Sequence, residues 1–442
     1  MSLDSDDLIK RLQALTAGHA PSRWVVAFSG GIDSTVLLHA LAKSTTRIPL
    51  LAVHIDHGLH SESASWESHC RSVAVGLNVD YQSRGVVVTD NNENGPEAAA
   101  RQARYAALLN IVRDGDCVLS GHHENDQAET LLLNLMRGSG PAGLAGIGAR
   151  QSFGRGLLLR PLLGISVESI SVYANDHNLS WIDDPTNVDT RFDRNFLRSE
   201  IVPKLAARWP AVSNRLRRSA ELVGEASELL NDLAEIDLAV CGHRDRLEIG
   251  ALTGLSHARQ RNLLRRAVRL CGLPPPPATR LYQVINELIP AREDAQPLVA
   301  WPGAEVRRYR GQLRIMAELD DTRLLPAGKL QAGGADVPLG PGLGSIGLTD
   351  QLTGGIDPAL ADQGLTVRFR QGGEEIRVAG QGTTRKLKKL LQEAGVLPWM
   401  RNRIPLVFAG DSLVAVGDIW VSADHVASGG LAIAWRDKPP LH

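Results

Sequence analysis

The first 200 residues alternate between short apolar runs and amphipathic segments, a pattern that predicts strands separated by helices. Expected strands are RWVVAF (23–28), LLAVHID (50–56), VDYQSRGVVV (79–88) and DCVLSG (116–121). Expected helices are STVLLHALA (34–42), SASWESHCRSVAVGL (63–77), EAAARQARYAALLNIVRD (97–114) and NDQAETLLLNLMRG (125–138). This alternation predicts an α/β fold with a doubly wound, Rossmann-like parallel sheet. In such sheets ligands bind at the carboxyl ends of the strands.

The pattern changes after Pro203 and becomes helical and arginine-rich, with helices expected over 214–237, 257–272 and 277–289. Glycine and proline dominate 326–355, which predicts loops and a boundary. A last unit combines a strand, a basic helix (383–395) and a hairpin that turns at Gly410-Asp411. We therefore expect four regions: an α/β domain (1–205), a helical domain (206–320), a linker (321–364) and a small α+β domain (365–442).

Length and composition fit this organisation. A chain of 442 residues is too long for one core, and 43% hydrophobic with 22% charged residues is typical of a soluble protein. The acidic, amphipathic start does not resemble a secretory signal, and no run approaches the roughly 20 apolar residues of a membrane span. Four cysteines lie far apart without a CxxC pair. We expect a cytoplasmic protein with reduced thiols and no membrane contact.

The net charge of −1 is distributed unevenly. Residues 1–200 hold 17 Lys/Arg against 23 Asp/Glu, whereas residues 201–442 hold 31 against 26. A basic second half favours contact with a polyanion, although scattered surface arginines give the same count. The arginines of the helical region and Arg385, Lys386, Lys388 and Lys389 are the candidate contacts for the phosphates of such a polyanion. For any one helix, a charged face that only solubilises explains the pattern equally well.

The clearest motif is Ser29-Gly30-Gly31-Ile32-Asp33-Ser34, between an expected strand and an expected helix. Backbone N–H groups of such a turn and the helix N-terminus form an anion site, and the glycines let a ligand approach the backbone. The lysine of a Walker loop is absent. Asp33 would repel a bare phosphate, so it argues for a metal ion, Mg²⁺, between carboxylate and phosphate oxygens. A serine-capped turn without a ligand is the alternative.

The SGGxDS form resembles the pyrophosphate-loop ATPases, which cleave ATP between the α- and β-phosphates and adenylate a substrate. Further motifs narrow the resemblance to the tRNA(Ile)-lysidine synthetases: VHIDHGLH (53–60), EAAARQARY (97–105), GHHENDQAET (121–130), RGSGPAGLAG (137–146), RPLL (160–163) and WIDDPTN…RNFLR (181–198). The resemblance continues more weakly into RFRQGGEEI and RKLKKLLQEAGVLPWMRNRIPLV near the C-terminus.

This resemblance implies a reaction and its participants. ATP would adenylate the C2 oxygen of the wobble cytidine in a tRNA(Ile) with a CAU anticodon, and free L-lysine would then displace AMP to give lysidine. The first domain would bind ATP through Ser29, Gly30, Gly31, Ile32, Asp33 and Ser34, with Asp33 holding Mg²⁺. The helical and C-terminal domains would bind tRNA, and a homodimer is one candidate assembly.

Candidate site residues follow from the same motifs. Asp126 and Glu129 are three apart, so on a helix they share a face and could hold the lysine ammonium, which is the role that the resemblance implies. A solvated acidic helix start is the alternative. The resemblance also implies catalytic roles for Asp33, His122 and Arg198, with Arg194 second to Arg198.

Several neighbouring residues stay open. His123 is expected to be structural, and a zinc site at His122-His123 lacks further ligands at suitable spacing. His54, His57 and His60 are pocket or surface residues. Arg101 and Arg104 suit either a salt-bridged helix face or a phosphate contact.

Two other functions compete with this one. A tRNA thiolase of the same superfamily would need paired cysteines, which the sequence lacks. A non-catalytic, nucleotide-dependent RNA-binding protein would not need Asp33, Asp126, Glu129 and Arg198 together.

Overall fold

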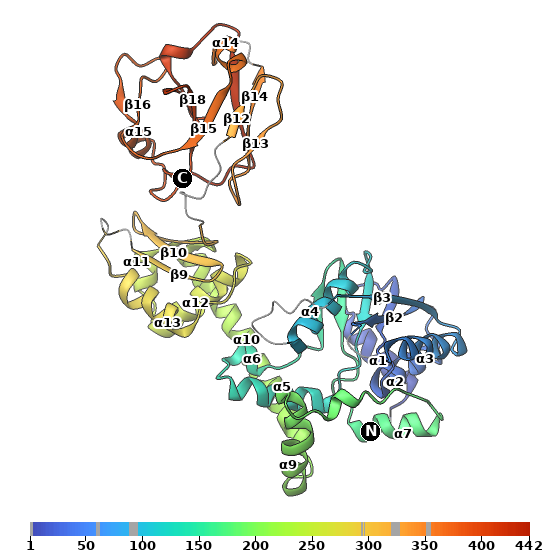
Figure 1. The fold of residues 1–442 in the computed structure, drawn as a ribbon. Helices are drawn as coiled ribbons and strands as arrows, with labels where there is room; N and C mark the ends of the chain where they lie inside the picture. Colours follow the sequence, from blue (N-terminus) through green and yellow to red (C-terminus); the bar gives the residue numbers. More distant parts are fainter. Residues whose placement is uncertain are drawn as a thin grey trace. The chain divides into compact units, whose positions relative to one another are not determined.

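The chain folds into two compact units, Met1–Asp232 and Leu233–His442. This computed structural model describes residues 3–58, 62–87, 96–292, 295, 297–319, 328–350 and 355–442. Figure 1 colours the chain from blue at the N-terminus to red at the C-terminus.

The first unit contains a six-stranded sheet in the order β3-β2-β1-β4-β6-β5. Its strands are β1 (Arg23–Ala27), β2 (Leu50–Asp56), β3 (Asp80–Gly85), β4 (Asp116–Leu119), β5 (Arg150–Phe153) and β6 (Gly156–Leu159). All neighbours pair in parallel except β5, which is antiparallel to β6. The central strand β1 therefore separates two halves of opposite strand order, and the edge beyond its carboxyl end is where ligands bind in such sheets. The predicted doubly wound α/β fold is confirmed.

The sheet is accompanied by helices, some of which pack on its two faces. They are α1 (Ser5–Leu15), α2 (Ile32–Ala42), α3 (Ser63–Gly76), α4 (Pro96–Leu109), α5 (Glu124–Met136), α6 (Pro141–Leu144), α7 (Val167–Asp176), α8 (Asp193–Phe196), α9 (Val202–Arg208) and α10 (Val212–Cys241), with a 3₁₀ turn η1 (Pro185–Val188) and a π turn η2 (Leu197–Ile201). α10 continues across the boundary into the second unit.

Successive strand residues point to opposite faces, which builds two cores. Trp24 and Val26 of β1 pack with α1, α2, α3 and α7, whereas Val25 packs with α4. β6 alternates in the same way, with Leu158 on the α4 side. Strands buried on both faces read as continuous apolar runs, which explains why the sequence predicts β1, β2 and β4.

The second unit contains two further cores. The first core joins α11 (Ile249–Thr253), α12 (His257–Leu270), α13 (Ala278–Gln283) and the π turn η3 (Val284–Leu288) to a sheet ordered β7-β8-β11-β10-β9. Its strands are β7 (Gly242–His243), β8 (Arg246–Glu248), β9 (Leu298–Trp301), β10 (Ala304–Tyr309) and β11 (Gln312–Met316). The sequence predicted helices at the places of α12 and α13, but neither α11 nor the antiparallel sheet.

The C-terminal core is built from short antiparallel strands. These are β12 (Gly328–Leu330), β13 (Val337–Pro338), β14 (Ser345–Asp350), β15 (Leu365–Phe369), β16 (Glu375–Ile376), β17 (Arg385–Lys386), β18 (Pro405–Ala409), β19 (Ser412–Val416), β20 (Trp420–Val421) and β21 (Leu431–Arg436), with helices α14 (Pro358–Asp362) and α15 (Leu387–Glu393) and the 3₁₀ turn η6 (Ala423–His425). β18 and β19 form the predicted hairpin around Gly410, whose φ is +60°.

The glycine- and proline-rich stretch is more ordered than the sequence indicated. β12 pairs with β15, and β14 pairs with β21 over six residues, so this stretch belongs to the C-terminal sheets. The sequence did not predict these strands, because glycine-rich segments have low strand propensity. Their pairing partners lie far along the chain, so local sequence does not reveal the pairing. His60 and parts of 321–364 lie outside the described residues. In the part of the chain that the structure describes, no helix is long and apolar enough to cross a bilayer.

Candidate active site

The lysine-free turn lies between β1 and α2, at the carboxyl edge of the central strand. Gly31 is the N-cap of α2 and provides no side-chain cap, so the first N–H groups of the helix have no side-chain acceptor there. The hydroxyls of Ser34 and Thr35 donate to the Gly31 carbonyl, both at 3.0 Å, and the Ser29 and Ser34 hydroxyls are 3.1 Å apart. A helix N-terminus of this kind is suited to bind an anion.

Gly30 occupies a position where any other residue would be strained. Its φ is +86°, and a Cβ there would lie 2.5 Å from Cδ1 of Ile182 and 2.8 Å from Sγ of Cys70. The Ile182 N–H also donates to the Gly30 carbonyl at 2.9 Å. The WIDDP motif therefore holds the turn in place, a role that the sequence did not assign to Ile182.

Asp33 faces the end of β4. A Cβ on Gly121 would lie 3.1 Å from the backbone carbon of Asp33, so a larger residue could fit only if this backbone moved away. Nε2 of His123 lies 3.7 Å from Oδ1 of Asp33 and 3.6 Å from Oδ2 of Asp126. The pKa of Asp33 is raised, first by burial and then by the Asp126 charge, which outweigh the opposite effects of His123 and Arg198. A cation bound beside Asp33 would thus stabilise its ionised carboxylate.

The start of α5 is built by a reciprocal cap. Nδ1 of His123 accepts from the Asn125 N–H at 3.2 Å, while Oδ2 of Asp126 accepts from the His123 N–H at 2.9 Å. This capping box fixes the Asp126 carboxylate and leaves its second oxygen directed at other groups. His123 is structural, as expected, although the sequence does not reveal that it is the cap.

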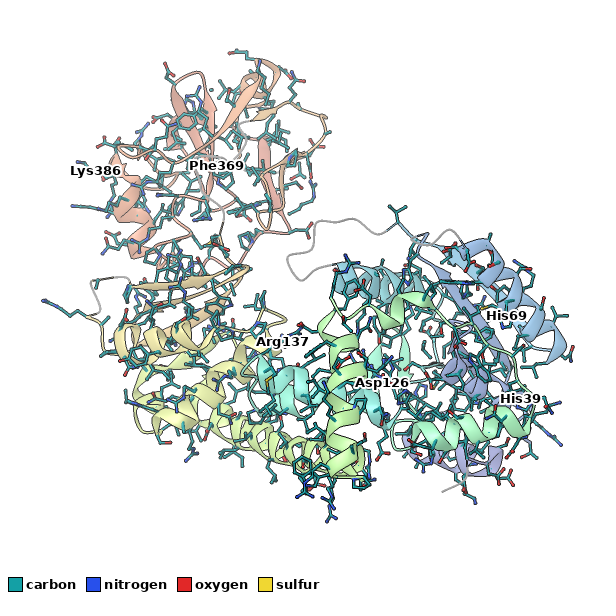
Figure 2. The ribbon with its side chains drawn as sticks, turned by 60° about the horizontal axis from the view of Figure 1, so that its bottom comes forward. His39, His69, Asp126, Arg137, Phe369 and Lys386 are labelled. Atoms are coloured by element: carbon teal, nitrogen blue, oxygen red, sulfur yellow. The ribbon has the colours of Figure 1, made fainter. Side chains whose placement is uncertain are left out.

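Two guanidiniums contact the carboxylate pair on α5. Arg194 donates to Oδ1 of Asp126 at 2.7 Å and to Oε2 of Glu129 at 3.0 Å. Arg198 donates to Oδ1 of Asp126 at 3.0 Å and to both Glu129 oxygens at 2.7 and 2.9 Å. Asp126 is labelled in Figure 2 within the first unit. Two carboxylates and two guanidiniums thus form a compact cluster whose charges balance.

Burial sets the strength of this cluster. The Glu129 side chain is 1% exposed and that of Arg194 is 19% exposed, whereas that of Arg198 is 40% exposed. Burial alone would raise the pKa of Asp126, but His123, Arg194 and His122 lower it to about 2. Burial alone would lower the pKa of Arg194 and Arg198, but the two carboxylates raise it. Asp126, Arg194 and Arg198 are therefore charged at neutral pH.

His122 lies beside this cluster and is uncharged. Its Nδ1 is 2.9 Å from the Ser120 hydroxyl. Burial, aided by the charges of Arg160, Arg194 and Arg104, lowers its pKa to about 3. A neutral imidazole can exchange a hydrogen bond with a ligand but brings no charge to it.

The remaining candidates lie around this centre. Nδ1 of His54 is 3.0 Å from the Phe28 carbonyl, so this side chain supports the turn from below. Burial and Arg104 lower the pKa of His57. Arg101 and Arg104 lie on α4, against Tyr105. The structure thus gathers Asp33, Asp126, Glu129, Arg194 and Arg198 through direct or His123-bridged contacts.

Metal binding by protein groups alone has no support among the described residues, where no three His, Cys, Asp or Glu side chains converge. Asp33 could instead contribute one carboxylate to a hydrated Mg²⁺ that shares phosphate oxygens, which is the usual protein environment of this ion.

Comparisons with known proteins agree with this geometry. A family model described as "PP-loop domain" matches residues 5–205, "TilS substrate binding domain" matches 247–314, and "TilS substrate C-terminal domain" matches 365–435. Proteins named tRNA(Ile)-lysidine synthase from Alkalilimnicola ehrlichii, Coxiella burnetii and Pseudomonas putida are 42%, 40% and 41% identical to the chain. These alignments cover 95%, 93% and 91% of this chain and 94%, 91% and 93% of the three relatives.

Proposed function

The chain belongs to the tRNA(Ile)-lysidine synthase family, and from that premise we propose how its own residues carry out the family's reaction. It is an ATP-dependent ligase that forms lysidine on tRNA(Ile). In this reaction the C2 oxygen of the wobble cytidine is adenylated, and the ε-amine of free L-lysine then displaces AMP. One observation carries the assignment: the lysine-free phosphate turn lies beside the buried carboxylate pair. His123 lies between them, with its Nε2 3.7 Å from Asp33 and 3.6 Å from Asp126.

ATP binding is assigned to Ser29, Gly30, Gly31, Ile32, Asp33 and Ser34. The uncapped start of α2 supports this, because its N–H groups suit the leaving pyrophosphate. Asp33 fits Mg²⁺, since burial and the nearby Asp126 charge raise its pKa and a cation would relieve both effects. When bound, Mg²⁺ neutralises charge that develops on the leaving phosphates.

Lysine binding is assigned to Asp126 and Glu129. Both carboxylates already accept from Arg194 and Arg198, so an ammonium can reach them only if a guanidinium withdraws. Arg198 is the candidate to withdraw, because its side chain is twice as exposed as that of Arg194. The ammonium would replace a positive charge with another, which keeps the buried cluster balanced.

Arg198 and His122 would then act on the nucleotide. A displaced Arg198 guanidinium can donate two parallel hydrogen bonds to phosphate oxygens. Neutral His122 can hydrogen-bond the adenylated base or the α-phosphate, where preorganised donors stabilise developing charge. Glu129 can accept the proton that the lysine amine must lose before it attacks.

The second unit is assigned to tRNA binding. Arg261 and Arg265 are one turn apart on α12, and burial together with the Arg261 charge lowers the pKa of Arg265. Like charges held this close are stabilised by an anion. Lys386, Lys388 and Lys389 are exposed on the C-terminal domain, where Figure 2 labels Lys386. Arg217, Arg266 and Arg385 instead pair with glutamates of the chain. A homodimer stays a prediction.

A thiolase reaction is not favoured. Burial raises the pKa of the Cys70 and Cys117 thiols to about 12 and about 11, so both are protonated at neutral pH. Cys70 lies beneath the phosphate turn and against His54, where it packs in the core.

The direct test is to incubate the protein with ATP, lysine and a tRNA(Ile) transcript that carries a CAU anticodon, and to weigh the nucleosides after digestion. The expected product is cytidine enlarged by one lysine with loss of water. Unmodified cytidine, under conditions where the protein binds the tRNA, would refute the proposed function.

A further inference from the structure

We propose that Arg101, Arg104 and Tyr105 on α4, backed by Arg160, form a subsite for an RNA phosphate that flanks the nucleotide being modified. This inference rests on the proposed function and adds the part of the tRNA that this side of the active site would bind.

Tyr105 is the centre of the subsite. The guanidinium carbons of Arg101 and Arg104 lie 5.6 and 5.8 Å from its ring centroid, and Phe153 packs against it edge-on at 5.8 Å. The buried guanidinium of Arg160 lowers the pKa of the Tyr105 hydroxyl. A surface hollow of about 510 Å³ opens here, lined by Arg101, Gln102, Tyr105, Ala106 and Leu109.

The positive charges of Arg101 and Arg160 are not balanced by a carboxylate of the described protein. Neither side chain forms an ion pair with Asp or Glu in the described ranges. Arg160 is only 4% exposed, and its Nη1 donates to the Gly148 carbonyl, yet its Nε has no hydrogen-bond partner among the described residues. This buried guanidinium therefore keeps a donor that an anion bound nearby could use.

The pKa of Tyr105 reflects the same excess of positive charge. Burial alone would raise the pKa of Tyr105, but the charges of Arg101, Arg160 and Arg104 lower it instead. An anion bound to these guanidiniums would restore the balance, and a phosphate matches their planar donor geometry.

The position of the cluster separates it from the ATP phosphates. α4 covers the sheet face opposite to α2, since Leu108 packs with Val25 whereas Leu37 of α2 packs with Val26. The turn at Ser29 lies at the start of α2. The cluster nevertheless borders the reacting groups. Arg160 directly follows Leu159, whose carbonyl accepts from the Ser120 N–H at 3.1 Å, and the Ser120 hydroxyl is 2.9 Å from Nδ1 of His122. An anion bound on the α4 face would therefore be distinct from the ATP phosphates. The backbone phosphate next to the nucleotide that is modified is the anion that best fits this position.

The test compares Arg101→Gln with Arg71→Gln. Arg71 is a matched control: it also stacks on a tyrosine, at 5.0 Å from the ring of Tyr81, but it pairs with Glu67 on α3. Binding of a tRNA(Ile) transcript is measured without ATP or lysine over a range of salt concentrations, and KM values are measured in the full reaction.

Arg101→Gln should weaken tRNA binding about tenfold, since a hydrogen bond to a charged group is lost. The slope of log affinity against log salt should fall by about 0.7, the value for one phosphate of a single strand. The KM for ATP and all constants of Arg71→Gln should stay within about twofold of wild type, because a surface ion pair such as Arg71 with Glu67 contributes little.

Three results would overturn the subsite. The first is an unchanged tRNA affinity and salt slope in Arg101→Gln. The second is an equal loss of tRNA affinity in Arg71→Gln. The third is a raised KM for ATP with normal tRNA binding in Arg101→Gln, which would mean that Arg101 binds a phosphate of ATP. Failure of the proposed function would appear differently, as wild-type protein that forms no lysidine while the binding comparison remains readable.

Discussion

Asp126 and Glu129 are carboxylates whose charge is balanced inside the protein by Arg194 and Arg198. The sequence predicted that the two acids share a helix face. It could not predict that both arginines contact both acids, because 65 or more residues separate the partners along the chain. Removing one member of a buried pair leaves an uncompensated charge, which typically costs about 3–5 kcal/mol.

Asp126→Asn and Glu129→Gln test the assignment of lysine to this pair. Because the ammonium would lose its ionic partner, the lysine KM should rise at least about tenfold while the ATP KM changes less than about threefold. Thermal unfolding of each variant separates this effect from loss of fold. Equal increases in both KM values would remove the carboxylates from lysine recognition.

Gly30 tests the shape of the phosphate turn. Gly30→Ala would place a Cβ 2.5 Å from Ile182 at a φ of +86°, and we expect at least about a tenfold loss of activity. Gly58→Ala is the matched control, since Gly58 also has a positive φ (+62°) but no atom of the described residues within 4 Å of the place that a Cβ would take. Comparable activity of the two variants would show that the turn tolerates the displacement.

At the scale of elements, the periodicity of the chain predicted the strands β1 to β4 of the parallel sheet and the helices between them. It missed the β5–β6 hairpin, whose first strand is exposed and carries no apolar alternation. It also missed the π turn η2, which follows α8 and carries Arg198. π turns often mark functional sites, and side-chain spacing alone does not reveal them.

The packing of α7 on α2 makes the first unit sensitive to acid. Nδ1 of His39 is 3.0 Å from the Tyr173 hydroxyl, and Tyr173 stacks on His177. Burial, with help from His177 and Lys43, lowers the pKa of His39 below its usual 6.5. The unfolded chain therefore takes up a proton near pH 6.5, while the folded chain does so only at lower pH.

Stability from this residue is consequently full above about pH 6.5 and is lost as the pH falls below it. His39→Gln keeps a polar group there but does not titrate. Denaturant unfolding from about pH 8 to about pH 5 should show wild type losing stability relative to His39→Gln only below about pH 6.5. Parallel curves throughout would indicate that His39 does not control this dependence.

At the scale of the whole molecule, the sequence predicted a basic second half that binds RNA. A set of exposed lysines on the C-terminal domain, Lys386, Lys388 and Lys389, tests this directly. Changing all three to Gln should raise the tRNA KM and reduce the salt slope by up to about 0.9 for each phosphate that the variant no longer neutralises, with kcat nearly unchanged. Lys10→Gln, an exposed lysine paired with Asp7 on α1, is the control. An unchanged tRNA KM in the triple variant would show that these lysines of the C-terminal domain do not bind RNA.

The central claim is that the turn from Ser29 to Ser34 holds the pyrophosphate that leaves ATP. The most direct measurement uses ATP labelled at the α-phosphate in a complete reaction with lysine and tRNA(Ile), followed by separation of the labelled products. We predict AMP in step with lysidine, and a loss of at least about 100-fold in Asp33→Asn with tRNA binding retained. Labelled ADP, or wild-type turnover in Asp33→Asn, would contradict it.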